Sequence, residues 1–194
     1  MRVLLSALLL ILLLALVKTF LDVFIVRRPS KAASVSQVLD VAKSGPGNLR
    51  HAVVNYSFRQ MEMKMLELIN SERKSHWLES RFAQPLQWDE SVAQVARGHS
   101  LSMARHGFMS HIGPDGTDPA ARLQRAGVAF TAAGENVARG YRTIEETMAA
   151  FMNQPRFRRR THRANILSPL FGRAGIGVVR DPNGGIVVTQ CFAR

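Results

Sequence analysis

Two histidines and one glutamate stand in three short polar segments and are the residues best suited to chemistry in this chain. His111 ends the segment at 107–111, Glu135 lies in the segment at 134–136, and His162 opens the segment at 162–167. Imidazole and carboxylate groups bind divalent metals and transfer protons near neutral pH. Each residue is expected in a loop beside a helix or strand signal, where a scaffold usually presents functional side chains. The three residues predict a shared site, with separate structural roles in caps and loops as the alternative.

Other side chains that are reactive in some proteins have structural interpretations here. His99 lies on the inward face of an expected helix, where a lone histidine is usually hydrogen-bonded within the core. Ser110 lacks the Gly-x-Ser-x-Gly pattern of a nucleophile and is expected in a turn. Cys191 is expected to be a small buried apolar residue in a strand, because no cation stands near it in the sequence. The short spacing of a metalloprotease motif is absent from the sequence.

The elements that must position these residues are expected to form one domain with an N-terminal appendage. The chain has 194 residues, of which 46% are hydrophobic, and this is enough for a substantial core. A single cysteine excludes an intrachain disulfide. The net charge of +12 favours anionic surfaces, which include phospholipid headgroups, acidic cell-wall polymers and nucleic acid. Nucleic acid is the least favoured of these partners, because aromatic residues make up only 7% of the chain.

The first 26 residues form a membrane signal. Residues 3–17 carry no charge, and residues 20–26 extend the apolar segment towards the ~20 residues that a spanning helix needs. We interpret 1–26 as an uncleaved signal anchor, with a cleaved signal peptide as the alternative. Residues 27–55 are expected to be a linker, and 56–194 the folded domain. Arg27, Arg28 and Lys31 follow the apolar segment and favour a cytoplasmic flank, which conflicts with export of the domain.

Capping residues and periodicity predict helices followed by a β-hairpin. The predicted helices span about 57–74, then from the cap at Asp89 to Gly107, from the cap at Asp118 to Gly127, and from the cap at Thr143 to just before Pro155. Two apolar segments at 175–179 and 186–192 flank a turn at 181–185, as in a hairpin. Both are apolar on both faces, which is typical of strands covered by helices on each side.

Five arginines form the densest group of charges: Arg156, Arg158, Arg159, Arg160 and Arg163. They are interpreted either as a docking patch for phosphate or carboxylate groups or as a solvated loop.

Taken in order, these motifs resemble the CAP superfamily, also called SCP domains, which comprises cysteine-rich secretory proteins, antigen 5 and pathogenesis-related proteins. The resemblance runs from about Met61 to Phe192 and is closest to the bacterial branch without disulfides. It rests on the following residues: His99, Ser100, Met103, Gly107, Phe108, Ser110, His111, Asp115, Gly116, Arg122, Gly127, the segment 134–138, Met152, Asn153, the segment 162–167 and the segment 175–177.

The resemblance implies a three-layer α-β-α sandwich of the α+β class, with a central histidine and glutamate cluster. His111, Glu135 and His162 would carry this cluster, which in the family can hold zinc or another divalent metal. Where the eukaryotic pattern has a second glutamate, this chain has Gln154. An amide is a poor metal ligand and no general base, which argues against metal-dependent catalysis.

The resemblance favours an extracytoplasmic binding module, anchored in a membrane or secreted. Its ligand would be a lipid, a cell-wall component or a partner protein. The alternative is a metal-assisted hydrolase of peptide or cell-wall bonds, in which Glu135 would be the base that activates water. A third hypothesis is a module that binds anionic surfaces or nucleic acid by charge alone.

Overall fold

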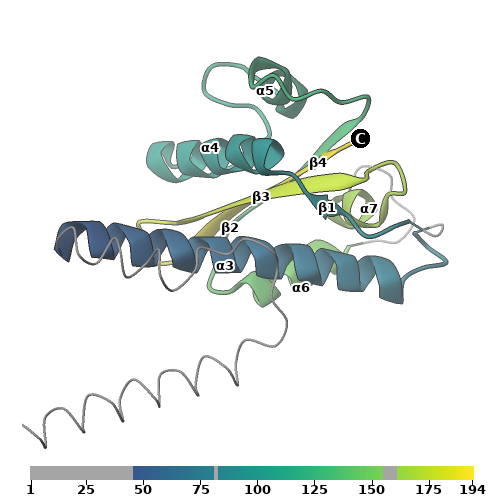
Figure 1. The fold of residues 1–194 in the computed structure, drawn as a ribbon, viewed down its shortest axis with the longest axis horizontal. Coiled ribbons are helices and arrows are strands. Elements are labelled where there is room, and N and C mark those ends of the chain that lie inside the picture. Colours follow the sequence, from purple (N-terminus) through teal and green to yellow (C-terminus); the bar gives the residue numbers. More distant parts are fainter. Residues whose placement is uncertain (1–45, 81–82, 155–160) are drawn as a thin grey trace, which may run out of the picture. The chain divides into compact units, whose positions relative to one another are not determined.

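The computed structural model describes residues 46–80, 83–154 and 161–194. The chain divides into two compact units, and the unit from Val54 to Arg194 contains the elements that build the site (Figure 1). The predicted membrane segment and the predicted linker up to residue 45 lie outside the described residues. Of the helices that are described, none is both long enough and apolar enough to cross a membrane.

The elements mix helices with strands and confirm the predicted α+β class. In chain order they are α3 (Pro46–Ser75), β1 (Gln87–Trp88), α4 (Glu90–His106), α5 (Pro119–Arg125), β2 (Ala133–Tyr141), α6 (Ile144–Met152), α7 (His162–Leu167), β3 (Arg173–Arg180) and β4 (Ile186–Ala193). The first helix was predicted to begin near residue 57, but α3 begins at Pro46 and takes in the end of the predicted linker.

Three predicted caps are present and start the helices that carry the site. Asp89 accepts hydrogen bonds from the backbone N–H groups of Ser91 and Val92 at the start of α4. Asp118 accepts from Ala121 at the start of α5, and the Thr143 hydroxyl accepts from Glu146 at the start of α6. Each side-chain oxygen satisfies a backbone donor that has no partner within its own helix.

The sheet has the strand order β1-β3-β4-β2. β3 and β4 form the predicted antiparallel hairpin, β1 runs parallel to β3, and β2 pairs antiparallel with β4 at the edge. Every residue of β4 is buried, as expected for a strand covered on both faces. β2 was not predicted as a strand, so Glu135 lies within a strand and not in the expected loop.

Helices cover both faces of this sheet, which confirms the three-layer sandwich. α4 and α5 lie over one face, while α6, α7 and the part of α3 after Val54 lie over the other (Figure 1). Side chains of β4 alternate accordingly: Val188 and Phe192 belong to the larger core with Met65 of α3, whereas Cys191 packs with Val92 of α4. This alternation follows from the two-residue period of a strand.

Two glycines of β3 let α4 lie directly against the sheet. A Cβ atom on Gly175 would lie 2.0 Å from the backbone nitrogen of Ala93, and one on Gly177 would lie 2.3 Å from that of Arg97. Neither distance leaves room for a carbon atom next to a helix backbone. The segment at 175–177 therefore sets how closely α4, and His99 on it, approaches the strands.

Candidate functional site

Glu135 of β2 is the centre of the candidate site. The residue is buried, with 6% of its surface exposed. Its Oε2 atom accepts a hydrogen bond from the Arg122 guanidinium at 2.6 Å, and its Oε1 atom lies 2.9 Å from Nδ1 of His111. Two of the three predicted site residues, His111 and Glu135, are thus in direct contact across 24 positions of the sequence.

Arg122 of α5 holds this contact in place and received no role from the sequence. Besides Glu135, its guanidinium donates to the carbonyl oxygens of His111 at 3.0 Å and Thr117 at 2.8 Å. It therefore fixes both the carboxylate and the backbone of the loop that carries His111. A guanidinium only donates hydrogen bonds and is always charged, so its hydrogen bond to the carboxylate is charge-assisted.

His99 of α4 has the structural role predicted for it. Its ring is buried, and Nε2–H donates to the carbonyl oxygen of Ser110 at 2.8 Å. The same nitrogen lies 3.8 Å from Oε1 of Glu135. Burial lowers the pKa of His99, and the attraction of Glu135 opposes this effect only in part. A neutral His99 thus ties the loop before His111 to the helix.

His162 is the first residue of α7, directly after the cap residue Thr161. Its ring packs on Phe151 of α6, with the ring centres 4.7 Å apart. Its backbone N–H donates to Oε1 of Gln154 at 2.8 Å, and its Nδ1 atom lies 2.9 Å from Nε2 of the same amide. Burial lowers the pKa of His162, and the electrostatic effect of His111 lowers it further.

A chain of amide side chains ties α7 to the edge strand that carries Glu135. Nδ2 of Asn136 donates to the carbonyl oxygen of His162 at 3.1 Å. Nδ2 of Asn165 donates to the carbonyl oxygen of Glu135 at 3.0 Å and to Oδ1 of Asn136 at 2.8 Å. Because β2 is at the edge of the sheet, residues from both helical layers can be linked to it in this way.

These contacts leave the three predicted metal ligands poorly arranged for a metal. Both oxygens of Glu135 are engaged by Arg122 and His111, and Nδ1 of His162 is engaged by Gln154. Within residues 46–80, 83–154 and 161–194, no group of three or more His, Cys, Asp or Glu side chains is placed to hold a metal ion. Among the described residues, the donor set is therefore not assembled as a metal site. Metal binding here stays a prediction for direct measurement.

Cys191 lies behind the carboxylate and is the buried apolar residue that was predicted. Its side chain is fully buried on β4, and Sγ lies 3.7 Å from Oε2 of Glu135. Burial raises the pKa of the thiol, and the negative charge of Glu135 raises it further. The thiolate, which is the nucleophilic form, is therefore suppressed.

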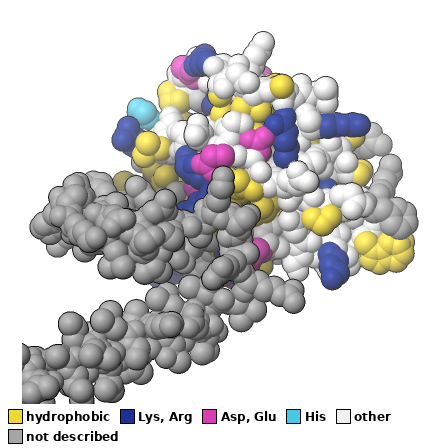
Figure 2. Space-filling view, viewed as in Figure 1, with side chains coloured by type: hydrophobic (Ala, Val, Ile, Leu, Met, Phe, Trp, Pro, Cys, Tyr) yellow, Lys and Arg dark blue, Asp and Glu magenta, His cyan; other side chains and the backbone are white. Residues whose placement is uncertain are grey.

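The predicted arginine patch is only partly within the described residues. Arg156, Arg158, Arg159 and Arg160 lie outside them. Arg163 is 6% exposed, and its guanidinium donates to both carboxylate oxygens of Glu79, at 3.0 and 2.7 Å. This burial removes Arg163 from any exposed patch. On the face drawn in Figure 2, basic side chains of the described residues are spread out, several of them beside acidic ones.

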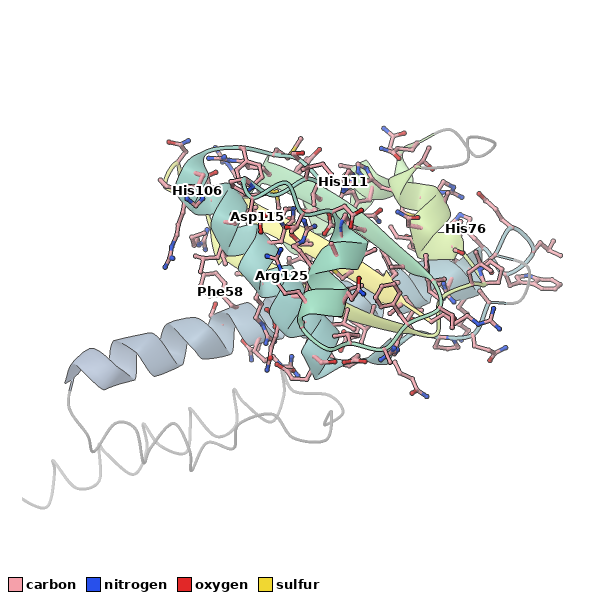
Figure 3. All side chains as sticks on the ribbon, turned by 90° about the horizontal axis from the view of Figure 1, so that it is seen from above. Phe58, His76, His106, His111, Asp115 and Arg125 are labelled. Carbon is pink, nitrogen blue, oxygen red and sulfur yellow. The ribbon has the colours of Figure 1, made fainter. Side chains whose placement is uncertain are left out.

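A separate pocket of about 500 Å³ lies between α4 and the segment that leads into α5. His99 and Arg122 contribute to its wall, so it adjoins the contacts of Glu135. His106, Asp115 and Arg125 line it as well, and Figure 3 shows these three residues over α4 and α5. Asp115 and Arg125 form an ion pair with atoms 2.8 Å apart at this exposed site.

Comparison with known proteins identifies the family. Residues 66–192 match the sequence model of the CAP, or cysteine-rich secretory protein, family. The chain belongs to the CAP family. Among curated proteins it is similar to YkwD of Bacillus subtilis, with 32% identity over 163 residues, and to the membrane protein YlbC of the same organism, with 31% identity over 119 residues. These alignments cover 84% and 61% of this chain.

Solved structures show the same fold. An extracellular protein with an SCP domain from Bacillus anthracis is 28% identical, with a TM-score of 0.63 over 77% of this chain. An outer surface protein of Borrelia burgdorferi is 17% identical, with a TM-score of 0.58 over 68% of this chain and 90% of that one, and shows the fold alone. This CAP chain spans only 55% of YkwD, 32% of YlbC and 44% of the Bacillus anthracis chain.

Proposed function

We propose that this CAP protein is an extracytoplasmic binding module, anchored in a membrane or secreted, for a lipid, a cell-wall component or a partner protein. The observation that carries the proposal is the state of Glu135. Both its oxygens are engaged, by Arg122 and by His111, in a buried setting. A carboxylate used in this way holds neighbouring side chains in place, and it is poorly suited to take a proton from water.

Two similarities support the location. The Bacillus anthracis relative is described as extracellular, and YlbC as a membrane protein. The apolar segment at 1–26 supplies a means of export or anchoring. The test is protease accessibility in intact spheroplasts, where an exported domain is digested without lysis. Digestion only after lysis would instead place the domain in the cytoplasm, in agreement with Arg27 and Arg28.

The binding function is tested with the purified full-length chain in detergent or nanodiscs. We expect it to bind purified cell-wall sacculi or lipid vesicles, and to hydrolyse neither a peptide library nor cell-wall fragments, with or without zinc. Metal analysis of the protein as purified decides whether zinc or another divalent ion accompanies it. Turnover that disappears in both Glu135→Gln and His162→Ala, at an unchanged melting temperature, would favour the hydrolase and overturn this proposal.

A further inference from the structure

The pocket between α4 and the segment that leads into α5 is bordered by small side chains of the helix. Its volume of about 500 Å³ lies within the range of about 300–1,000 Å³ that is usual for small-ligand sites. Gly98 and Ser102, one turn apart on α4, both line it. A Cβ atom on Gly98 would meet nothing within 4 Å, so the space beside this glycine is open. A narrow, chain-like group can therefore lie along α4 here.

Most of the other uncharged residues around the pocket are apolar or small. They are Val95 of α4, Gly113 and Pro114 before α5, and Ala126 directly after α5. Contacts with these residues are made through methyl and methylene groups, which favour apolar groups of a ligand.

The charged side chains of the pocket favour an anionic group. Arg122, Arg125 and Asp115 line it, so their charges sum to +1, and His106 adds to this when it is protonated. Both oxygens of Asp115 are engaged: Oδ1 accepts from the backbone N–H and the hydroxyl of Thr117, and Oδ2 accepts from Nη1 of Arg125. The side chain of Arg125 is 68% exposed, and its Nη2 group has no partner in the part of the chain that the structure describes. This group is available to donate to a ligand.

Arg122 has one donor without an acceptor. Its two terminal nitrogens donate to Glu135 and to the carbonyl oxygens of His111 and Thr117. Its Nε atom is buried and has no hydrogen-bond partner among the described residues. A buried donor without an acceptor is costly, so an acceptor brought by a ligand at this wall would stabilise it. A carboxylate forms the strongest hydrogen bonds with a guanidinium.

We propose that this pocket binds the C-terminal end of a short cell-wall peptide with small apolar side chains, and that Arg125 and Arg122 bind its free carboxylate. The proposal rests on the proposed binding function and names the ligand as the peptide part of a cell-wall component. The small side chains of the peptide lie beside Gly98, and the Ser102 hydroxyl pairs with a peptide amide. Binding at this site requires no metal.

Titration calorimetry of the full-length chain in detergent tests the class of ligand. The probes are N-acetyl-alanyl-alanine, in its L,L and D,D forms, and the same peptides with a C-terminal amide. We expect at least one form to bind, and its amide to bind about 10-fold more weakly or worse, because the amide lacks the charge that the two arginines recognise. Hexanoate, which has a carboxylate and an apolar chain but no peptide groups, should bind more weakly than the peptide. Equal binding of the peptide and its amide would overturn the proposal, as would hexanoate binding as tightly as the peptide.

Gly98→Leu tests the place of binding. The leucine side chain would occupy the open space beside α4, and leucine is a better helix former than glycine, so the melting temperature should not fall. We expect this variant to lose binding of the peptide. The matched control is Gln94→Leu, which puts the same side chain one turn earlier on α4, at an exposed position outside the pocket lining. Peptide affinity of Gly98→Leu equal to that of wild type would contradict the assignment of the pocket.

Arg125→Gln tests the recognition of the carboxylate. We expect it to weaken binding of the peptide by about 3-fold or more, as is usual for loss of one exposed charge contact. Arg105→Gln removes an exposed arginine of α4 that does not line the pocket, and it should leave the affinity unchanged. Equal losses in the two variants would mean that the net charge attracts the peptide, and would overturn the role of Arg125.

The pocket and the proposed function fail in different ways. If the chain binds sacculi but none of the alanine peptides, the peptide assignment is overturned while the proposed function stands. If the chain binds an alanine peptide but neither sacculi nor vesicles, the proposed function fails while the pocket remains a peptide site.

Discussion

Gln154 contacts the backbone N–H of His162 at 2.8 Å and its ring nitrogen Nδ1 at 2.9 Å, and so fixes both the position and the tautomer of this histidine. The fold brings the contact about because Gln154 follows the end of α6 and His162 begins α7. Phe151 of α6 packs against the same ring. The amide of Gln154 donates to Nδ1 of His162, whereas the carboxylate of a glutamate at position 154 would accept from it. This one substitution would therefore invert the direction of the hydrogen bond.

Replacing Glu135 by glutamine should lower stability substantially. Its side chain is 1% exposed and that of Arg122 is 12% exposed, so the variant leaves a largely buried guanidinium without its counter-charge. Breaking a pair of this kind costs about 3 kcal/mol, which urea unfolding measures. The matched control is Glu145→Gln on the exposed side of α6, which should change stability by less than about 0.5 kcal/mol. Equal effects of the two variants would contradict the structural role of Glu135.

Replacing Gly177 by alanine should destabilise the domain by about 3 kcal/mol or more, because the new Cβ would lie 2.3 Å from a backbone nitrogen of α4. The helix and the strand would have to separate, which moves His99 away from Ser110. Gly98→Ala on α4 is the control, since a Cβ there meets nothing within 4 Å. It should gain about 0.5–1 kcal/mol, because alanine is the better helix former. A loss of stability in Gly98→Ala would show that the contacts around α4 are misassigned.

The sequence predicted the parts of the fold that have local signals. Asp89, Asp118 and Thr143 were identified as caps, because a short polar side chain before an amphipathic segment has few other roles. The hairpin of β3 and β4 was recognised from two apolar segments around a turn. α3 was predicted too short because Pro46 and Gly47 were interpreted as part of a linker. Proline is tolerated in the first turn of a helix, where its missing N–H costs nothing.

The parts that were missed depend on contacts between distant residues. β2 contains Gly134 and Gly140 and polar residues between them, so its sequence is weak as a strand, and pairing with β4 makes it one. Arg122 stands in a short helix, and nothing in its spacing predicts that it reaches Glu135. The amide contact of Gln154 is likewise a property of the packing of α6 and α7. The family motifs include Arg122 and Glu135, but they do not indicate that these two side chains are in contact.

Stability should fall as the pH is lowered below about 6.5. Burial lowers the pKa values of His99 and His162 below their ordinary value of 6.5, so the unfolded chain binds protons that the folded chain does not. The stabilisation that comes from keeping these two histidines neutral is complete above about pH 6.5 and is lost progressively as the pH falls below it. Urea unfolding at about pH 7.5 and about pH 5.5 measures the change, which should be smaller in His162→Gln. A folded state that becomes more stable on acidification would exclude this explanation.

Replacing Arg158, Arg159 and Arg160 by glutamine should weaken binding to anionic vesicles at low salt and leave stability unchanged. Electrostatic attraction to an anionic surface acts over about 8 Å at physiological ionic strength, so the difference from wild type should shrink as salt is added. Vesicle co-sedimentation across a salt series measures the effect.

The controls for this series use arginines whose surroundings are described. Arg163→Gln removes a buried guanidinium that pairs with Glu79, so it should lower stability without lowering vesicle binding beyond the effect of one charge. A triple variant at exposed positions removes the same total charge elsewhere: Arg105→Gln, Arg142→Gln and Arg180→Gln. If this variant weakens vesicle binding as much as the change at 158–160 does, attraction is a property of the net charge of +12 and not of a patch. A larger loss from the change at 158–160 would assign membrane attraction to the segment directly before His162.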